Sequence, residues 1–346
     1  MHTVTIKDIA KALNLSTSTV SRALRDSYEI NAETKRLVLE YAEKHHYHPN
    51  PIALSLKENR SRAIGVIVPE IANNFFSEAI NGIEAIAYNR GYHVIISQSH
   101  ESYEREVVNI RQIVARRVDG LLISLSGHTT DVSHLKELVD KGLPIVFFDR
   151  VSDEMDRHKV VADNYQGAFE AVEHLIQTGR KRIALIASLP WLSNTQERLA
   201  GYKAALEKHG LPCDENLIRY CDFGIDEPEK KVTELLTYQP DALFMARDRL
   251  ALICLSILKK LGINVPKDLA LLGFTNIKVA DLFSPPLTVV SQPAFEIGHT
   301  AADLLLDLIE KKTRALPFQT IKLPTTLIVR NSTHHNLSLP DVFSAK

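Results

Sequence analysis

Residues 4–24 read VTIKDIAKALNLSTSTVSRAL, and this stretch decides the fold of the N-terminal part of the chain. Thr5 followed three residues later by Asp8 is a capping-box pattern, which starts a helix. A second short helix is expected after Ser16 and a third after Asn31, because both residue types cap helix N-termini. The pattern therefore predicts an all-α head of three short helices, a helix-turn-helix.

The start of the second helix is the part of such a head that meets base edges in the major groove. Thr17 and Ser18 occupy these positions, and Arg22 follows one turn later. Arginine can bond guanine bidentately, whereas short hydroxyls discriminate less between bases. The alternative is a three-helix knob that only packs, with Arg22 as a solvated charge. The spacing alone leaves both interpretations open.

More specific residues favour DNA binding. The run Thr19-Val20-Ser21-Arg22 and the segment Tyr47-His48-Pro49-Asn50 closely resemble the lactose/galactose repressor (LacI/GalR) family. The resemblance continues to about Thr333 and implies a regulator that binds pseudo-palindromic operator DNA. The DNA-binding residues that it implies are Thr5, Ser16, Thr17, Ser18, Thr19, Ser21, Arg22, Tyr47, Asn50, Ala53 and Leu56.

Residues 49–62 are expected to link the helix-turn-helix domain (1–48) to a larger body (63–346). Two prolines at the start of the link end the third helix, because proline lacks an amide donor. Residues 52–57 have room for one or two helical turns, which are marginal in water. In the family, the matching segment is a hinge helix that wedges a leucine, here Leu56, into the minor groove. The alternative is a plain linker whose leucines pack on the body.

The body alternates between short apolar runs and amphipathic stretches. The apolar runs predict strands at 63–68, 93–97, 120–125, 144–148, 182–187, 241–246 and 269–274. Helices are expected at 75–90 and 105–117 and from residues 196, 229 and 248. This alternation predicts two doubly wound parallel α/β sheets. Because no dinucleotide fingerprint, P-loop or GxSxG motif occurs, the sequence disfavours an α/β enzyme.

The resemblance adds the topology of the body. It implies a fold similar to periplasmic sugar-binding proteins, with two lobes, three crossovers and a ligand cleft between the lobes. The crossovers are expected near 161–163, 290–292 and 323–325. The segments expected for the N-lobe are about 63–162 and 291–323, those for the C-lobe about 163–290 and 324–333, with a tail at 334–346.

Effector-binding residues follow from the family pattern, position by position. The matching positions here are Phe76, Asp149, Arg198, Arg247 and Thr275. Phe76 would line the cleft, Asp149 would accept bonds from ligand hydroxyls, and Arg198 would clamp the effector. The alternatives are that Asp149 caps a helix or pairs with Arg150, and that Arg198 only binds a nearby carboxylate.

Two departures from the family pattern bear on the effector. Arg247-Asp248 stands where asparagine-aspartate is usual, and Thr275-Asn276 stands where an acid is usual. An added guanidinium and a lost acid favour an anionic ligand. The sequence thus suggests an acidic or phosphorylated sugar, unless Arg247 is neutralised by Asp248 or the cleft takes no effector.

Composition and charge set further limits. The 346 residues are 45% hydrophobic and 24% charged, which is ordinary for a soluble globular protein. Residues 1–62 carry a charge balance of +3 and the remainder −4, as expected if only the head meets phosphate. Without a signal peptide or a long apolar span, we expect a cytoplasmic protein with no membrane contact. The three cysteines, Cys213, Cys221 and Cys254, form no CxxC pair, which argues against disulfides and zinc.

Competing functions lack their sequence features. A transport sugar-binding protein would share the body but would need an export signal and no head. The histidines at 45–48 and 334–335 have no acids or cysteines at ligand spacing, so no metal or cofactor is expected. The proline-broken end has no leucine heptads, so we expect a homodimer, formed through the N-lobe face that includes helix 75–90. The sequence predicts a non-enzymatic repressor of carbohydrate metabolism genes, controlled by a small sugar-type effector.

Overall fold

The computed structural model describes residues 4–47, 60–222, 228–248, 250–311 and 317–334. The chain divides into two compact units, residues 1–61 and residues 62–346, called here the head and the body. Leu56, Asn50 and Ala53, to which DNA-binding roles were assigned above, lie outside the described residues.

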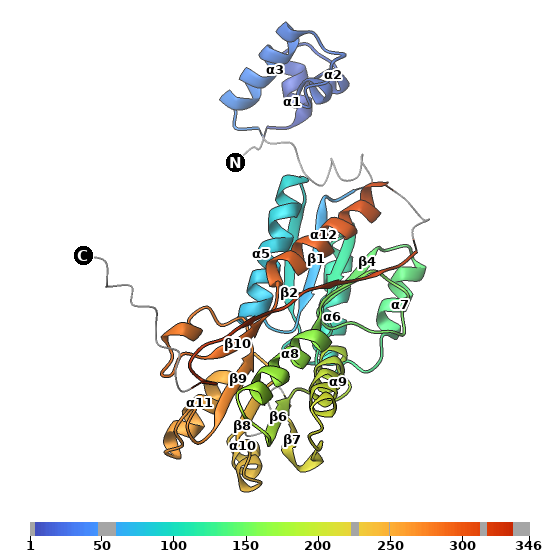
Figure 1. Ribbon diagram of the computed structural model, residues 1–346. Coiled ribbons are helices and arrows are strands. Elements are labelled where there is room, and N and C mark those ends of the chain that lie inside the picture. The colour runs from blue at the N-terminus through green and yellow to red at the C-terminus, as the bar shows by residue number, and fades with distance from the viewer. Residues whose placement is uncertain (1–3, 48–59, 223–227, 249, 312–316, 335–346) are drawn as a thin grey trace, which may run out of the picture. The chain divides into compact units, whose positions relative to one another are not determined.

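The described part of the head is all-helical. Its helices are α1 Ile6–Ala12, α2 Thr17–Ala23 and α3 Ala32–Lys44 (Figure 1). Thr5 and Asp8 form the predicted capping box, and Ser16 caps α2 through the backbone N–H of Thr19. Ile9, Val20 and Val38 have no exposed surface and form a core shared by the three helices. The prediction of a three-helix head is confirmed.

The first sheet of the body has the strand order β11-β5-β4-β3-β1-β2, and every pairing in it is parallel. Its strands are β1 Ala63–Val68, β2 His93–Gln98, β3 Gly120–Ile123, β4 Ile145–Phe148, β5 Lys159–Ala162 and β11 Thr320–Leu323. The strand order reverses between β1 and β3. Loops diverge at such a point and leave a crevice beyond the strand ends.

The second sheet has the order β12-β10-β9-β8-β6-β7. Its strands are β6 Ile183–Ala187, β7 Ile218–Tyr220, β8 Ala242–Met245, β9 Ala270–Phe274, β10 Thr288–Ser291 and β12 Thr326–Ile328. β12 runs antiparallel to β10, which differs from the purely parallel sheet that we predicted. It enters directly from β11 of the first sheet, without the crossover helix that a parallel neighbour needs.

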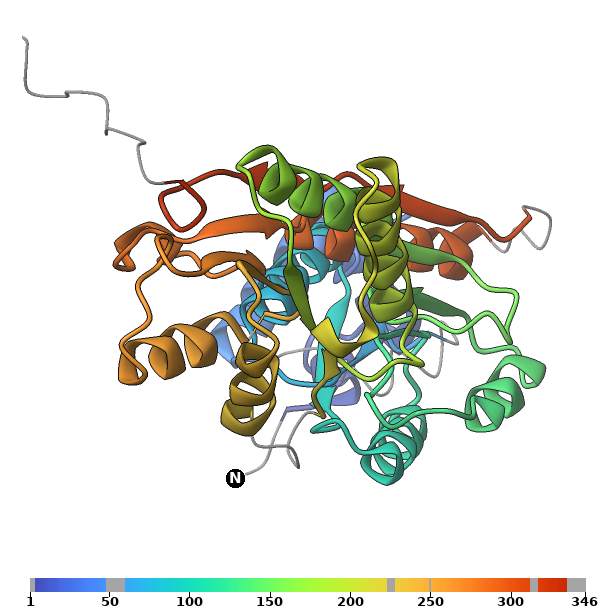
Figure 2. The same ribbon diagram turned by 60° about the horizontal axis from the view of Figure 1, so that its bottom comes forward.

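Helices cover both faces of each sheet (Figures 1 and 2). On the first sheet, α5 Asn74–Asn89 and α12 Ala294–Lys311 pack on one face, and α6 Tyr103–Ala115 and α7 Ser133–Asp140 on the other. On the second sheet, α8 Asn164–Gln177 and α9 Ser193–Lys208 oppose α10 Pro228–Thr237 and α11 Leu250–Lys260. Two short 3₁₀ turns, Glu215–Leu217 and Ala280–Leu282, complete the described elements. The first sheet with its helices is called the N-lobe and the second the C-lobe.

Close helix packing in each lobe depends on glycine. A Cβ on Gly298 of α12 would lie 1.9 Å from the carbonyl oxygen of Ala79 on α5. A Cβ on Gly201 of α9 would lie 2.2 Å from the carbonyl oxygen of Tyr165 on α8. Neither position has room for a side chain, so backbone approaches backbone. The Gly201 contact allows α9 to lie close to α8, and Arg198 lies three residues before it on α9.

The alternating pattern of the body is confirmed, with shifted element ends. The helix expected from Gln196 begins at Ser193, because its N-terminus has no capping side chain that the sequence could reveal. The helix expected from Asp248 is described from Leu250, and the strand expected to reach Leu125 ends at Ile123. The chain passes between the sheets at Asp163, between β10 and α12, and between β11 and β12.

Candidate effector site and DNA-binding head

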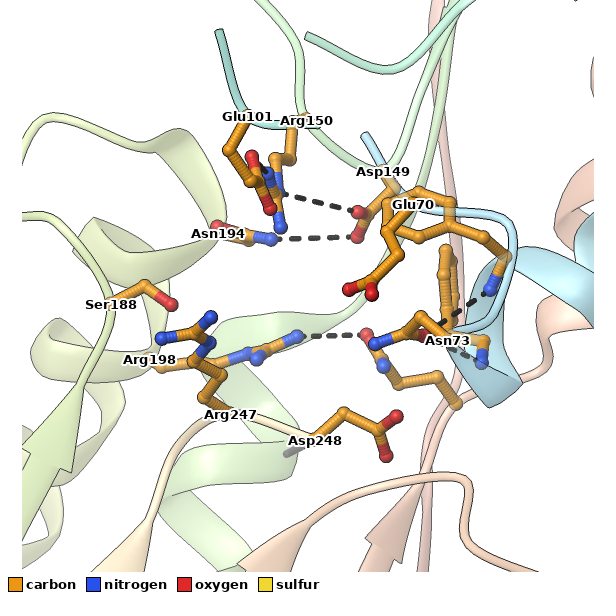
Figure 3. A pocket seen from close by; sticks show the side chains of 13 residues that line it. Glu70, Asn73, Glu101, Asp149, Arg150, Ser188, Asn194, Arg198, Arg247 and Asp248 are labelled. Carbon is orange, nitrogen blue, oxygen red and sulfur yellow. Dashed lines mark hydrogen bonds and ion pairs between the residues drawn. The ribbon is translucent and has the colours of Figure 1, made fainter. Parts of the chain in front are cut away.

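A small polar cavity lies in the body where the strand ends of both sheets meet. Its volume is about 50 Å³. This is far below the roughly 300–1,000 Å³ of small-molecule sites, so the cavity in this conformation is too small to hold such a ligand by itself. It is lined by Glu70, Asn73, Phe75, Phe76, Glu101, Asp149, Arg150, Ser188, Asn194, Arg198, Arg247, Asp248 and Gln292 (Figure 3). Most of these residues follow a strand or begin the next helix, which is where α/β sheets bind ligands.

Two lining carboxylates stand on left-handed backbone. Glu101 has φ of 61° and Asp149 has φ of 58°. This conformation costs a non-glycine residue about 1–2 kcal/mol. Such residues persist where the surrounding structure holds them, and they cluster at functional sites. The turns after β2 and β4 thus place two acids in the cleft against a local backbone cost.

Arg150 covers the aromatic wall of the cavity. Its Nη1 lies 2.7 Å from Oε2 of Glu101, which also accepts the backbone N–H of Gly127 at 2.7 Å. The Arg150 guanidinium carbon lies 5.7 Å from the ring centroid of Phe76. Burial alone would lower the pKa of Arg150, but the carboxylates of Glu101 and Asp149 raise it above the usual value. Arg150 is therefore a firmly charged group of the cavity wall beside the Phe76 ring.

Arg198 is held by three internal acceptors. Its Nε donates to Oδ1 of Asn164 at 2.9 Å, its Nη1 to the carbonyl of Ala246 at 2.9 Å, and its Nη2 to Oε1 of Gln292 at 2.8 Å. The guanidinium carbon lies 3.8 Å from the ring centroid of Phe274. Burial lowers the pKa of Arg198 to about 10, which leaves the side chain charged near neutral pH. The fork has five N–H donors, so part of it remains for a ligand.

Asp149 is the buried acid of the cleft. It is 5% exposed, and its Oδ1 accepts from the Asn194 amide at 3.4 Å (Figure 3). Burial raises the pKa of the Asp149 carboxyl, and the nearby guanidinium groups of Arg150 and Arg198 offset this only in part. An acid of this kind is a ready acceptor for a ligand hydroxyl, which would replace its lost hydration.

Thr275 lies behind the cavity wall. Its side chain has no exposed surface, and its hydroxyl donates to Oδ1 of Asp248. The same carboxylate oxygen accepts the backbone N–H of Asn276 at 3.0 Å. Thr275 thus orients Asp248, which lines the cavity in its place. Arg247 also lines the cavity, and its Nη1 donates to the carbonyl of Asp222 at 3.3 Å.

A larger chamber adjoins the small cavity and shares Arg150 with it. Its volume is about 520 Å³, within the range of small-molecule sites. Its wall comes from both lobes, with Thr129, Arg150 and Val151 on one side and Trp191, Ser193 and Gln196 on the other. Trp191 Nε1 donates to the carbonyl of Gly127 at 2.8 Å, and His128 Nε2 lies 3.0 Å from Oδ1 of Asp222. These two contacts join the lobes beside the chamber.

In the head, the predicted DNA-binding residues divide by exposure. Thr17, Ser18 and Arg22 are exposed on α2. Ser16 is occupied in capping, since its hydroxyl also lies 2.8 Å from Oγ1 of Thr19. The Thr5 hydroxyl donates to Asp8 at 2.7 Å. Ser21 and Tyr47 are half-buried.

Comparisons with known proteins decide the family. The profile of the bacterial regulatory proteins of the lacI family matches residues 5–50, and that of a periplasmic binding protein-like domain matches residues 172–333. The HTH-type transcriptional repressor CytR of Escherichia coli (strain K12) is 37% identical over 309 residues, which cover 88% of this chain and 90% of that protein. The chain belongs to the LacI family. It is a transcriptional regulator with a DNA-binding and an effector-binding domain.

Solved structures agree with this assignment. The crystal structure of the lac repressor dimer bound to operator and the anti-inducer ONPF aligns with a TM-score of 0.83 at 26% identity, covering 96% of the regulator and 99% of that chain. The complex of the transcriptional regulator CelR with cellobiose aligns with a TM-score of 0.72 at 30% identity, covering 95% and 99%. The predicted family and fold class are thereby confirmed.

The structure brings four of the five predicted effector residues of the regulator to one cavity: Phe76, Asp149, Arg198 and Arg247. Their binding role stays a prediction, as does that of Thr275. Sequence reasoning did not assign Glu70, Asn73, Glu101, Ser188, Asn194 and Gln292 to the cavity. Among the described residues, no group of three or more His, Cys, Asp or Glu side chains could hold a metal ion. No helix in that part of the regulator is long and apolar enough to cross a membrane.

Proposed function

We propose that the regulator is a cytoplasmic repressor of carbohydrate metabolism genes that binds operator DNA as a homodimer and a sugar-type effector in its cleft. The observation that carries the effector part is the cavity lining. Donors and acceptors from both lobes converge there beside an aromatic ring, at the strand ends where α/β proteins bind ligands. A sugar hydroxyl both donates and accepts, which matches alternating guanidinium and carboxylate groups.

The charge of the cleft bears on which sugar it takes. Three guanidinium groups, those of Arg150, Arg198 and Arg247, face four carboxylates, those of Glu70, Glu101, Asp149 and Asp248. This balance favours a neutral sugar over the acidic or phosphorylated one suggested by Arg247 alone. The 520 Å³ chamber supplies the volume that the inner cavity lacks. The cellobiose complex of CelR supports a neutral saccharide as the ligand class.

The effector acts by favouring one arrangement of the lobes. A ligand shifts an equilibrium only through its different affinity for the two states. A sugar that contacts Asp149 of the N-lobe and Arg198 of the C-lobe has its full set of bonds only when the lobes are close. Its binding would thus stabilise the arrangement in which the lobes are already joined by the hydrogen bond from Trp191 to Gly127.

The first test is a titration of the purified protein with neutral sugars, sugar acids and sugar phosphates. The readout is the fluorescence of Trp191, the only tryptophan of the chain, whose indole bonds to the opposite lobe. We expect a saturable change with at least one neutral sugar and a matching rise in thermal stability. Absence of any response across the panel would contradict the sugar effector and leave the family assignment intact.

The second test concerns DNA and assembly. Selection of random duplexes with the full chain should return a pseudo-palindrome, since two heads of a dimer read two half-sites. Sedimentation should give a dimer. A selected sequence without twofold symmetry, together with a monomer in solution, would contradict the homodimer.

A further inference from the structure

An acidic residue holds the arginine that is expected to read bases. Arg22 Nη1 lies 2.9 Å from Oε2 of Glu29. The two side chains are 57% and 45% exposed, so the pair stands on the surface of the head, at the end of α2. Glu29 comes from the loop between α2 and α3 and is therefore not part of the recognition helix itself.

The loop that carries Glu29 is built into the head. Asp26 takes a left-handed φ of 52°, and Lys35 of α3 fixes it through a 2.7 Å ion pair. The backbone N–H of Ser27 donates to the carbonyl of Arg22 at 3.1 Å, which folds the loop back on the last turn of α2. These contacts hold the first part of the loop against α2 without the help of the Arg22–Glu29 ion pair.

We propose that Glu29 is a positioning residue for base recognition, which orients the Arg22 guanidinium toward a guanine in the major groove. This inference rests on the proposed operator binding. The guanidinium has five N–H donors in a rigid fork. One contact to Glu29 through Nη1 leaves enough donors for the bidentate contact that arginine makes with O6 and N7 of guanine.

Glu29 has two physical effects on DNA binding, and only one of them depends on the DNA sequence. Arginine carries considerable rotamer entropy, and the ion pair restricts the side chain before DNA arrives. This favours the specific complex, in which one guanidinium orientation is required. The carboxylate is also repelled by DNA phosphates, and this penalty falls on every DNA sequence. The restriction of the Arg22 side chain benefits only a complex with the correct base, so Glu29 raises the ratio of specific to non-specific affinity.

The experiment compares the full chain with Glu29→Ala and Glu29→Gln on the selected operator and on a scrambled duplex, at one salt concentration. We expect the specificity ratio to fall about two- to five-fold per half-site, the range that exposed ion pairs give. Non-specific affinity should not fall. When each base pair of a half-site is varied in turn, the loss of base discrimination should be largest at one pair.

Two controls separate orientation from charge and from folding. Glu33→Gln removes another exposed acid, at the start of α3, and should leave the ratio unchanged. In an Arg22→Ala background, Glu29→Ala should no longer alter base preference, because a positioning residue has nothing left to position.

The outcomes are distinct. A ratio that falls with Arg22 present and not in its absence supports the proposal. An unchanged ratio overturns the proposal. This includes the case in which both affinities fall equally because the head has a lower melting temperature. If the wild-type chain selects no sequence at all, the proposed operator binding fails, and this inference fails with it.

Discussion

Arg198 Nη2 donates to Oε1 of Gln292 at 2.8 Å, and this bond joins α9 of the C-lobe to the crossover after β10. The two residues are 94 positions apart in sequence. The bond places the candidate effector clamp against one of the segments about which the lobes would move. A ligand that takes donors from Arg198 therefore acts close to the hinge.

Replacing Arg198 with alanine should destabilise the body and abolish the effector response. The substitution leaves the buried acceptors of Asn164, Ala246 and Gln292 without their donor, and an unsatisfied buried acceptor costs about 1–3 kcal/mol. Urea unfolding measures the free energy. Lys203→Ala on the same helix removes an exposed cation that pairs with Glu215 and should cost less than about 1 kcal/mol. Equal losses of unfolding free energy in the two variants would show that the hydrogen bonds of Arg198 stabilise the body no more than an exposed ion pair does.

Arg247→Ala should discriminate between the two classes of sugar. If the effector is neutral, we expect its affinity to change less than about ten-fold, since Asp149 and Arg198 keep the main contacts. An anionic effector would lose a charge-assisted bond and bind far more weakly. Calorimetric titration with the sugar found in the panel measures the difference. A loss confined to sugar acids or phosphates would establish the anionic cleft suggested by the sequence.

Local signals explain why much of the fold could be predicted. Thr5 and Asp8 together predict a helix start from only four residues. Each short apolar run likewise predicts a strand without reference to the rest of the chain. The antiparallel direction of β12 could not be predicted in this way, because it depends on where in space β11 of the first sheet ends.

The candidate site was predictable only where a family pattern exists. Phe76, Asp149, Arg198 and Arg247 stand at matching positions. Glu101 carries no such signal, since it lies 49 residues from the Arg150 that it binds and adopts left-handed backbone without being glycine or asparagine. Its role emerges only when the loops after β2 and β4 meet.

Leu56→Ala should weaken operator binding more than non-specific binding. The reason comes from the sequence, where Leu56 matches the wedge that a family hinge helix inserts into the minor groove. Titrations on the selected operator and a scrambled duplex measure both affinities. Leu54→Ala, two residues away in the same segment, is the matched control. Equal loss on the two duplexes would exclude a wedge role for Leu56.

His174 should make the stability of the body depend on pH. Burial, with a smaller contribution from His334, lowers the pKa of His174 to about 4, while its Nε2 lies 2.9 Å from Oγ1 of Thr333. In the unfolded chain a histidine titrates near 6.5. The fold thus favours the neutral ring, and its contribution is complete above about pH 6.5 and is lost as the pH falls toward 4. Allowing for partial exposure of the ring, we expect a loss of about 1–2 kcal/mol between pH 7 and pH 5.

Urea unfolding of the wild type and of His174→Gln at pH 7 and pH 5 measures this contribution. Glutamine keeps a hydrogen-bonding group near Thr333 but does not titrate, so the variant should lose less stability on acidification than the wild type. His93→Gln replaces an exposed histidine at the start of β2 and should behave as the wild type does. Identical pH dependence in all three proteins would mean that His174 is protonated as readily in the folded as in the unfolded chain.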